Sequence, residues 1–136
     1  MEKFESNIKE IPYNQTLVYA KLSDLNNLAA IQDKLPNDKI KNLTFDADTL
    51  SFEVSPVGVI SMKIVERESP TCIKLETIQS PQAFNLWIQL LPVTASVCKM
   101  KLTIKISLNP FMKGMIKKPL AEGLEKMATM LASIPY

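Results

Sequence analysis

The chain has 136 residues, 46% of them hydrophobic and 22% charged, and its formal net charge is only +2. This length and composition predict one globular domain over residues 1–136, large enough to bury a core without disulfides or metals. Histidine is absent and only three glycines occur. This composition excludes Ser-His and Cys-His nucleophile pairs, the commonest metal ligand and glycine-rich phosphate loops.

The sequence predicts a cytoplasmic protein. Residues 1–5 are charged and no apolar segment follows them, so we expect no signal peptide. The most apolar stretch, Leu86 to Val93, is too short and too polar to span a bilayer. Cys72 and Cys98 fall within predicted strands, where reduced, buried thiols are expected rather than redox chemistry or a zinc site.

The first third of the chain predicts one strand and two short helices. Apolar and polar residues alternate over residues 4–8, which is typical of a half-buried strand. One helix is predicted over residues 17–22. A second begins at Ser23 or Asp24 and is closed by Pro36.

Six strands are predicted between Lys39 and Ile106. The turn Asp46-Ala47-Asp48 joins the first two as a hairpin; its acids lack the spacing of a calcium loop, so a solvated turn is favoured over a cation site. Pro56 and Gly58 predict a bulge or corner. The remaining strands cover approximately residues 60–64, 73–75, 84–91 and 98–106, with a turn over residues 92–96 before the last.

A long amphipathic helix is predicted from Asn109 to Ile134. Asn109 suits the N-cap and Pro110 the first helical position. Pro119 lacks the N–H of a regular helix, so either the helix kinks at Lys118 or a second helix begins there. We favour the kink, because the apolar stripe keeps its phase through Pro119. The stripe consists of Met112, Ile116, Leu120, Leu124, Met127, Leu131 and Ile134.

The resulting order, β-α-α-β-β-β-β-β-β-α, predicts an α+β fold in which the last helix covers one face of an antiparallel sheet. The chain resembles the START-like (SRPBCC) superfamily of lipid-transfer domains, pollen-allergen-like proteins and polyketide cyclases. The resemblance rests on this order and on three passages: Ile11-Pro12-Tyr13 through Ser23-Asp24, Val65-Glu66-Arg67-Glu68, and Asn109-Pro110 before the long helix. It implies a helix-grip fold, often with a cavity for an apolar ligand. The glycine-rich loop of pollen-type members is absent.

A ligand cavity between the sheet and the last helix is therefore predicted. Methionine is adaptable and suits either a ligand wall or ordinary core packing, and both interpretations stay open. The predicted lining residues are Phe52, Met62, Ile64, Ile73, Leu75, Leu86, Ile88, Met100, Leu102, Met112, Met115, Ile116, Leu120 and Met127.

A second candidate region is a basic surface. No acid occurs between Thr77 and Ala121, whereas six lysines do. They form either a solvated face or a contact for an anionic lipid head group, a membrane surface or an acidic partner. Trp87 lies either on the outer face, which we favour, or in the cavity with Asn85 and Gln89. The predicted surface residues are Trp87, Lys99, Lys101, Lys105, Lys113 and Lys117.

The function expected from this pattern is binding of a small hydrophobic or amphipathic ligand, lipid-like or polycyclic. An interaction module with a filled core is the first alternative. A cyclase- or dehydratase-type enzyme is the second, and it needs a buried acid–base pair that the sequence does not nominate. No cofactor, metal, nucleic acid or stable membrane insertion is expected, and the protein is predicted to be a monomer or homodimer.

Overall fold

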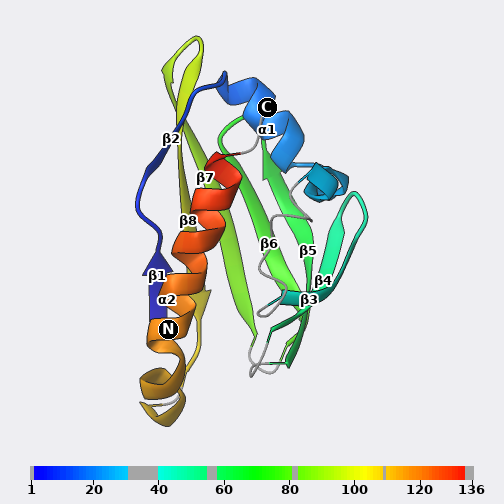
Figure 1. Cartoon of the computed structure of the whole chain (residues 1–136), viewed down its shortest axis with the longest axis vertical. Helices are drawn as coiled ribbons and strands as arrows, with labels where there is room; N and C mark the ends of the chain where they lie inside the picture. The colour runs from blue at the N-terminus through cyan, green and yellow to red at the C-terminus, as the bar shows by residue number, and fades with distance from the viewer. Residues whose placement is uncertain (1, 31–39, 55–57, 81–82, 109, 134–136) are drawn as a thin grey trace.

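The computed structural model of the chain describes residues 2–30, 40–54, 58–80, 83–108 and 110–133 (Figure 1). Pro36, Pro56 and Asn109, to which the sequence assigned a helix end, a bulge and a helix cap, lie outside the described residues. Seven further side chains also lie outside this description: Leu28, Ala30, Ile40, Val54, Met112, Ile116 and Pro119.

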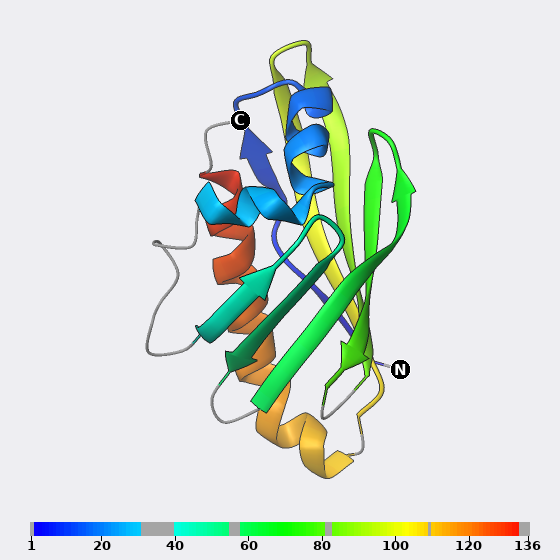
Figure 2. The same cartoon turned by 90° about the vertical axis from the view of Figure 1, so that its right-hand side faces the viewer.

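The described strands form one antiparallel sheet in the order β1-β8-β7-β6-β5-β4-β3, and β2 also pairs with β8. The sheet is curved and long hairpins join its neighbouring strands (Figures 1 and 2). The predicted meander and the α+β helix-grip architecture are confirmed. The strands are β1 (Glu2–Glu5), β2 (Lys9–Ile11), β3 (Ile40–Phe45), β4 (Thr49–Val54), β5 (Gly58–Glu68), β6 (Cys72–Gln79), β7 (Phe84–Thr94) and β8 (Val97–Ile106).

The predicted first strand is split in two, contrary to the expectation of one strand over residues 4–8. Ser6 causes the split, because its side chain replaces a strand-to-strand hydrogen bond. The Ser6 N–H donates to the Leu102 carbonyl at 2.9 Å, and Ser6 Oγ accepts from the Leu102 N–H, also at 2.9 Å. The chain then leaves the sheet at Ile8, which is exposed, and returns to it in β2.

Strand β7 is longer than the sequence predicts, since it continues through Pro92 to Thr94. Proline lacks an N–H and is tolerated where a strand has a neighbour on only one side. The pairing of β7 with β6 stops at Gln89, whereas its pairing with β8 continues to Thr94. Pro92 therefore lies in a part of β7 that is bonded to β8 alone.

The two predicted short helices are present, and they lie at one end of the sheet. Helix α1 (Gln15–Leu22) is capped by Asn14, whose Oδ1 accepts from the Thr16 N–H at 2.8 Å. The second helix is a 3₁₀ helix, η1 (Leu25–Ala30), and not an α-helix. Arg67 of β5 fixes the junction between them: its guanidinium donates to the Ser23 carbonyl at 2.9 Å and pairs with Asp48 of the β3–β4 turn at 2.5 Å.

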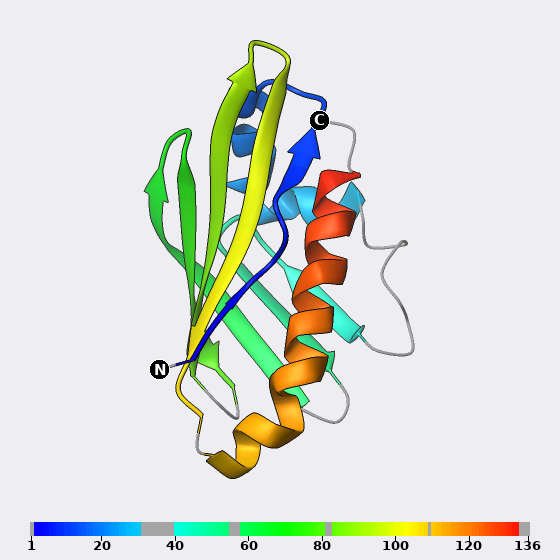
Figure 3. The same cartoon turned by 90° about the vertical axis from the view of Figure 1, so that its left-hand side faces the viewer.

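The long helix α2 (Pro110–Ala132) begins at the predicted proline and runs without a break past position 119, so the alternative of a second helix is wrong. Its first turns lie at an angle to the rest (Figures 2 and 3). The helix packs along β1, β2 and β8, and the remaining strands curve around it. No helix in the described part of the chain combines the length and apolar content that spanning a bilayer requires.

Candidate functional site

The apolar interior lies between α2 and the sheet face that it covers, here called the inner face. The alternation of β5 to β8 directs every second side chain to this face. Phe52 of β4, also predicted to line a cavity, is half-buried and packs against the core. Eight of the predicted lining residues are buried there: Met62, Ile64, Ile73, Leu75, Leu86, Ile88, Met100 and Leu102.

Burial is not uniform along the interior. At the end closed by α1, side chains such as Ile11, Val18 and Leu90 are at most 1% exposed. Toward the start of α2, the apolar side chains pack against the core but are only partly buried. These are Phe52 of β4, Phe84 at the start of β7, Leu108 between β8 and α2, and Leu120 of α2. Leu50 and Met127 are also partly buried, but Leu50 follows the β3–β4 turn and Met127 lies in the second half of α2. The side chains at the end closed by α1 are therefore the most deeply buried, and several of those toward the start of α2 are partly exposed.

On α2, the most deeply buried side chains lie in the second half of the helix. Leu124, Ala128 and Leu131 in its second half are buried, whereas Leu120 is only half-buried. The prediction that Met115 lines the interior is wrong, because this side chain is 62% exposed. Met115 precedes Leu124 by nine residues, or two and a half turns, which places the two on opposite sides of the helix. Met112 and Ile116 lie outside the described side chains.

Two ionic contacts attach α2 to the N-terminal strands. Lys113, in the first turn of α2, lies 2.9 Å from Glu2 of β1. This pairing lowers the pKa of Glu2 and offsets the unfavourable position of a cation at a helix N-terminus. Farther along, Glu125 accepts from the Asn7 N–H and pairs with Lys9 at 3.1 Å. Both contacts are on the β1–β2 side of the helix.

We expect Glu125→Gln to lower the free energy of unfolding at neutral pH by about 0.5–1 kcal/mol, because the contacts are largely exposed. The hydrogen bond from Asn7 and the pairing with Lys9 lower the pKa of Glu125 from its usual value of 4.5. Because the pKa of Glu125 is lower in the folded state, its ionised carboxylate stabilises the fold above pH 4.5. This contribution is lost as the pH falls through the lowered pKa. Urea unfolding of both proteins should show the difference at pH 7 and its disappearance in acid.

Few polar groups enter the described interior. The buried polar side chains among the described residues are Ser6 and Thr103, and of these Thr103 lies on the opposite face of the sheet. Burial raises the pKa of the Cys98 thiol, and the Tyr19 hydroxyl donates to the Cys72 carbonyl at 3.3 Å. No group of three or more potential metal-ligating side chains gathers in the described ranges. The described interior is therefore almost entirely apolar.

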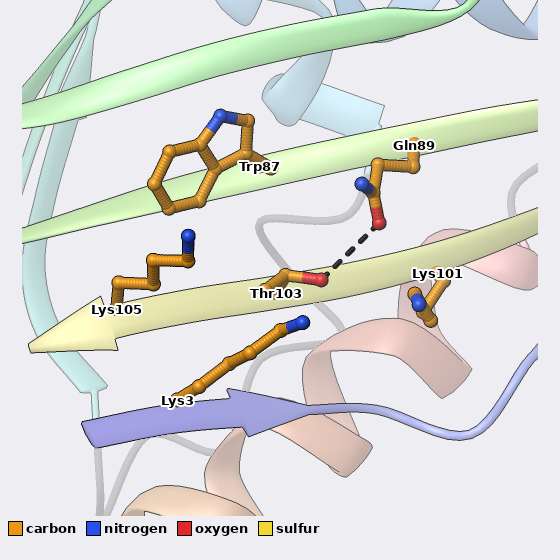
Figure 4. Close-up of a pocket in the computed structure, with 6 residues that line it drawn as sticks. All are labelled: Lys3, Trp87, Gln89, Lys101, Thr103 and Lys105. Carbon is orange, nitrogen blue, oxygen red and sulfur yellow. Dashed lines mark hydrogen bonds between the residues drawn. The ribbon is translucent and has the colours of Figure 1, made fainter. Parts of the chain in front are cut away.

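The opposite, outer face of the sheet carries a hollow of about 240 Å³, which we call the outer hollow (Figure 4). Trp87 belongs to it, because its neighbours Leu86 and Ile88 are buried on the inner face. The alternative in which Trp87 enters the cavity is therefore wrong. The outer hollow is lined by Lys3, Trp87, Gln89, Lys101, Thr103 and Lys105.

Only part of the predicted basic surface converges on the outer hollow. Lys99 and Lys117 are exposed elsewhere, and Lys113 pairs with Glu2. Lys3 and Thr103 were missed as site residues, although Lys3 lies opposite Lys105, and Thr103 opposite Trp87, in the strand register. A sequence without a known register gives no signal that these pairs are neighbours.

Comparisons with known proteins identify the fold. No protein-family model matches the chain, and a search of curated proteins found no match either. Norcoclaurine synthase from Thalictrum flavum, solved in complex with dopamine and hydroxybenzaldehyde, superposes with a TM-score of 0.73 at 15% identity, covering 96% of this chain and 84% of that one.

Two bacterial structures are also similar. A START superfamily protein from Mycobacterium smegmatis has a TM-score of 0.59 at 14% identity, with 95% of this chain and 98% of that one covered. A conserved protein from Geobacillus kaustophilus has a TM-score of 0.61 at 16% identity, with coverages of 96% and 90%. These likenesses agree with the strand order and the long C-terminal helix, and the chain has the START-like helix-grip fold.

Proposed function

We propose that the protein binds a small hydrophobic or amphipathic molecule, lipid-like or polycyclic, between the inner face and the first half of α2. The whole chain acts as one START-like domain in this proposal. The two free cysteines, Cys72 and Cys98, suit the reducing environment of the cytoplasm, where we place this activity.

The change in burial along the interior carries the proposal. Apolar side chains are rarely left partly exposed in a cluster unless another surface covers them. Here Phe52, Phe84 and Leu120 are partly exposed on the inner side, whereas side chains such as Val18 and Leu90 at the opposite end are buried. An apolar ligand at this position removes the cluster from water, and each Å² of apolar surface that it buries contributes roughly 25 cal/mol.

The fold neighbours support the binding of a small molecule in general terms. The plant synthase has been solved with two small aromatic molecules bound, and its fold matches this chain over nearly its whole length. Aromatic or lipid-like compounds of similar size are therefore reasonable first candidates. A catalytic role is not part of the proposal, because the described interior offers no acid–base pair.

The neutral fluorophore N-phenylnaphthylamine is a suitable probe, because its emission increases in an apolar site and it carries no charge for the lysines to attract. We expect saturable binding of one molecule per chain. Leu120→Trp, which adds an indole ring on the inward side of α2, should weaken this binding by about tenfold or more, since it fills space that the probe needs. Fluorescence titration measures both quantities.

Met115→Trp is the matched control, because it adds the same ring to the same helix on its exposed side. Its affinity for the probe should equal that of the wild type. If the wild-type protein binds no probe and Leu120→Trp loses stability through overcrowding, the interior is filled, and the interaction-module alternative replaces this proposal.

A further inference from the structure

We propose that the outer hollow is a binding site for an oxyanion with two negative charges, of the phosphate monoester class. This site is on the opposite face of the sheet from the apolar interior. The proposal does not depend on ligand binding in that interior.

The charges around the outer hollow favour such a ligand. Three lysines line it, from β1 and β8, and no carboxylate does. Glu5 pairs with two of these lysines, at 2.8 Å from Lys3 and 3.1 Å from Lys101. Counting Glu5 against the three lysines leaves two positive charges at the rim. A doubly charged oxyanion matches this excess.

Trp87 lies between two lysines of the neighbouring strands, and of these Lys105 lines the outer hollow. The ammonium groups of Lys105 and Lys74 each lie 5.5 Å from the centre of its ring. Neither of these lysines has an ion pair with an acid among the described residues. The aromatic ring attracts both ammonium groups but does not neutralise them, so Lys105, which lines the outer hollow, is available to an anion there.

The floor of the outer hollow supplies fixed polar groups. Thr103 is only 4% exposed, although it lies on the outer face, and its hydroxyl donates to Gln89 Oε1 at 3.2 Å. This bond occupies the amide oxygen of Gln89 and leaves its amide nitrogen on the side of Trp87 (Figure 4). The remaining groups are therefore hydrogen-bond donors, which suit phosphate oxygens.

The chain contains a single tryptophan, so the intrinsic emission of the wild-type protein reports on the outer hollow. We expect inorganic phosphate to change this emission saturably at a constant ionic strength of about 0.15 M, held with sodium chloride. Lys105→Gln and Lys3→Gln should each weaken phosphate binding by about fivefold. Glu5→Gln removes the nearby carboxylate and should strengthen binding by about threefold.

Lys117→Gln is the matched control, because it removes one exposed lysine from α2 and should leave the dissociation constant unchanged. Vesicles distinguish a lipid head group from a free metabolite. A response to phosphatidic acid in phosphatidylcholine vesicles, absent with phosphatidylcholine alone, identifies a lipid as the source of the phosphate. A response to phosphate without one to these vesicles identifies a free phosphate compound.

Two results overturn the proposal. One is an emission that does not change when phosphate replaces chloride at equal ionic strength. The other is a dissociation constant that changes equally in Lys105→Gln and Lys117→Gln, because general attraction to a basic protein then accounts for the binding.

Discussion

Leu124→Ala is expected to lower the free energy of unfolding by about 3 kcal/mol. Leu124 is 2% exposed and lies in the half of α2 that packs against the core. Alanine at this position leaves a void that the curved sheet cannot close, because β2 and β8 are fixed by their own hydrogen bonds. Urea unfolding followed by circular dichroism measures the change.

Met115→Ala provides the comparison on the same helix. Met115 is 62% exposed, so its truncation should change the free energy of unfolding by no more than about 0.5 kcal/mol. Equal losses in the two variants contradict the placement of Leu124 inside and Met115 outside.

Ser6→Ala is expected to cost about 2 kcal/mol, although it removes a single oxygen atom. Ser6 is 6% exposed, and its Oγ is the acceptor for the Leu102 N–H at 2.9 Å. Alanine leaves this buried N–H without an acceptor, which is more costly than the loss of a hydrogen bond at the surface.

Ser61→Ala is the matched serine control. Its Oγ bonds to Ser51 Oγ at 2.9 Å, but both side chains are half-exposed and water replaces the lost contact. We expect a loss of about 0.5 kcal/mol or less. Amide exchange of Leu102 adds a local readout, because it should accelerate in Ser6→Ala and not in Ser61→Ala.

The sequence pattern predicted the architecture well where periodicity decides the structure. The stripe through Leu120, Leu124 and Leu131 predicted α2, and the alternation along β8 predicted the longest uninterrupted strand pairing. The pattern failed where a single side chain or the extent of a neighbouring strand determines the local structure. Ser6 splits the first strand because its side chain accepts a hydrogen bond from the Leu102 N–H. Strand β7 tolerates Pro92 because its pairing with β6 stops at Gln89.

The candidate sites were less predictable, because they depend on register and on which side of a helix a residue lies. Which side of α2 carries Met115 follows only from the positions of the buried residues, such as Leu124, in the second half of the helix. Lys3 and Lys105 are a hundred residues apart in sequence and become neighbours only because β1 pairs with β8. Composition indicated a basic region after Thr77, but not the N-terminal lysine that completes the outer hollow.

The position of β8 between β7 and β1 has a consequence for synthesis on the ribosome. The first eleven residues find their partner strand only after Ile106 has left the exit tunnel, and α2 follows it. We therefore expect hairpins from β3 to β7 to assemble early, while the nascent N-terminal segment waits unpaired. Chains stalled before residue 97 should leave this segment open to protease, and release of the finished chain should protect it.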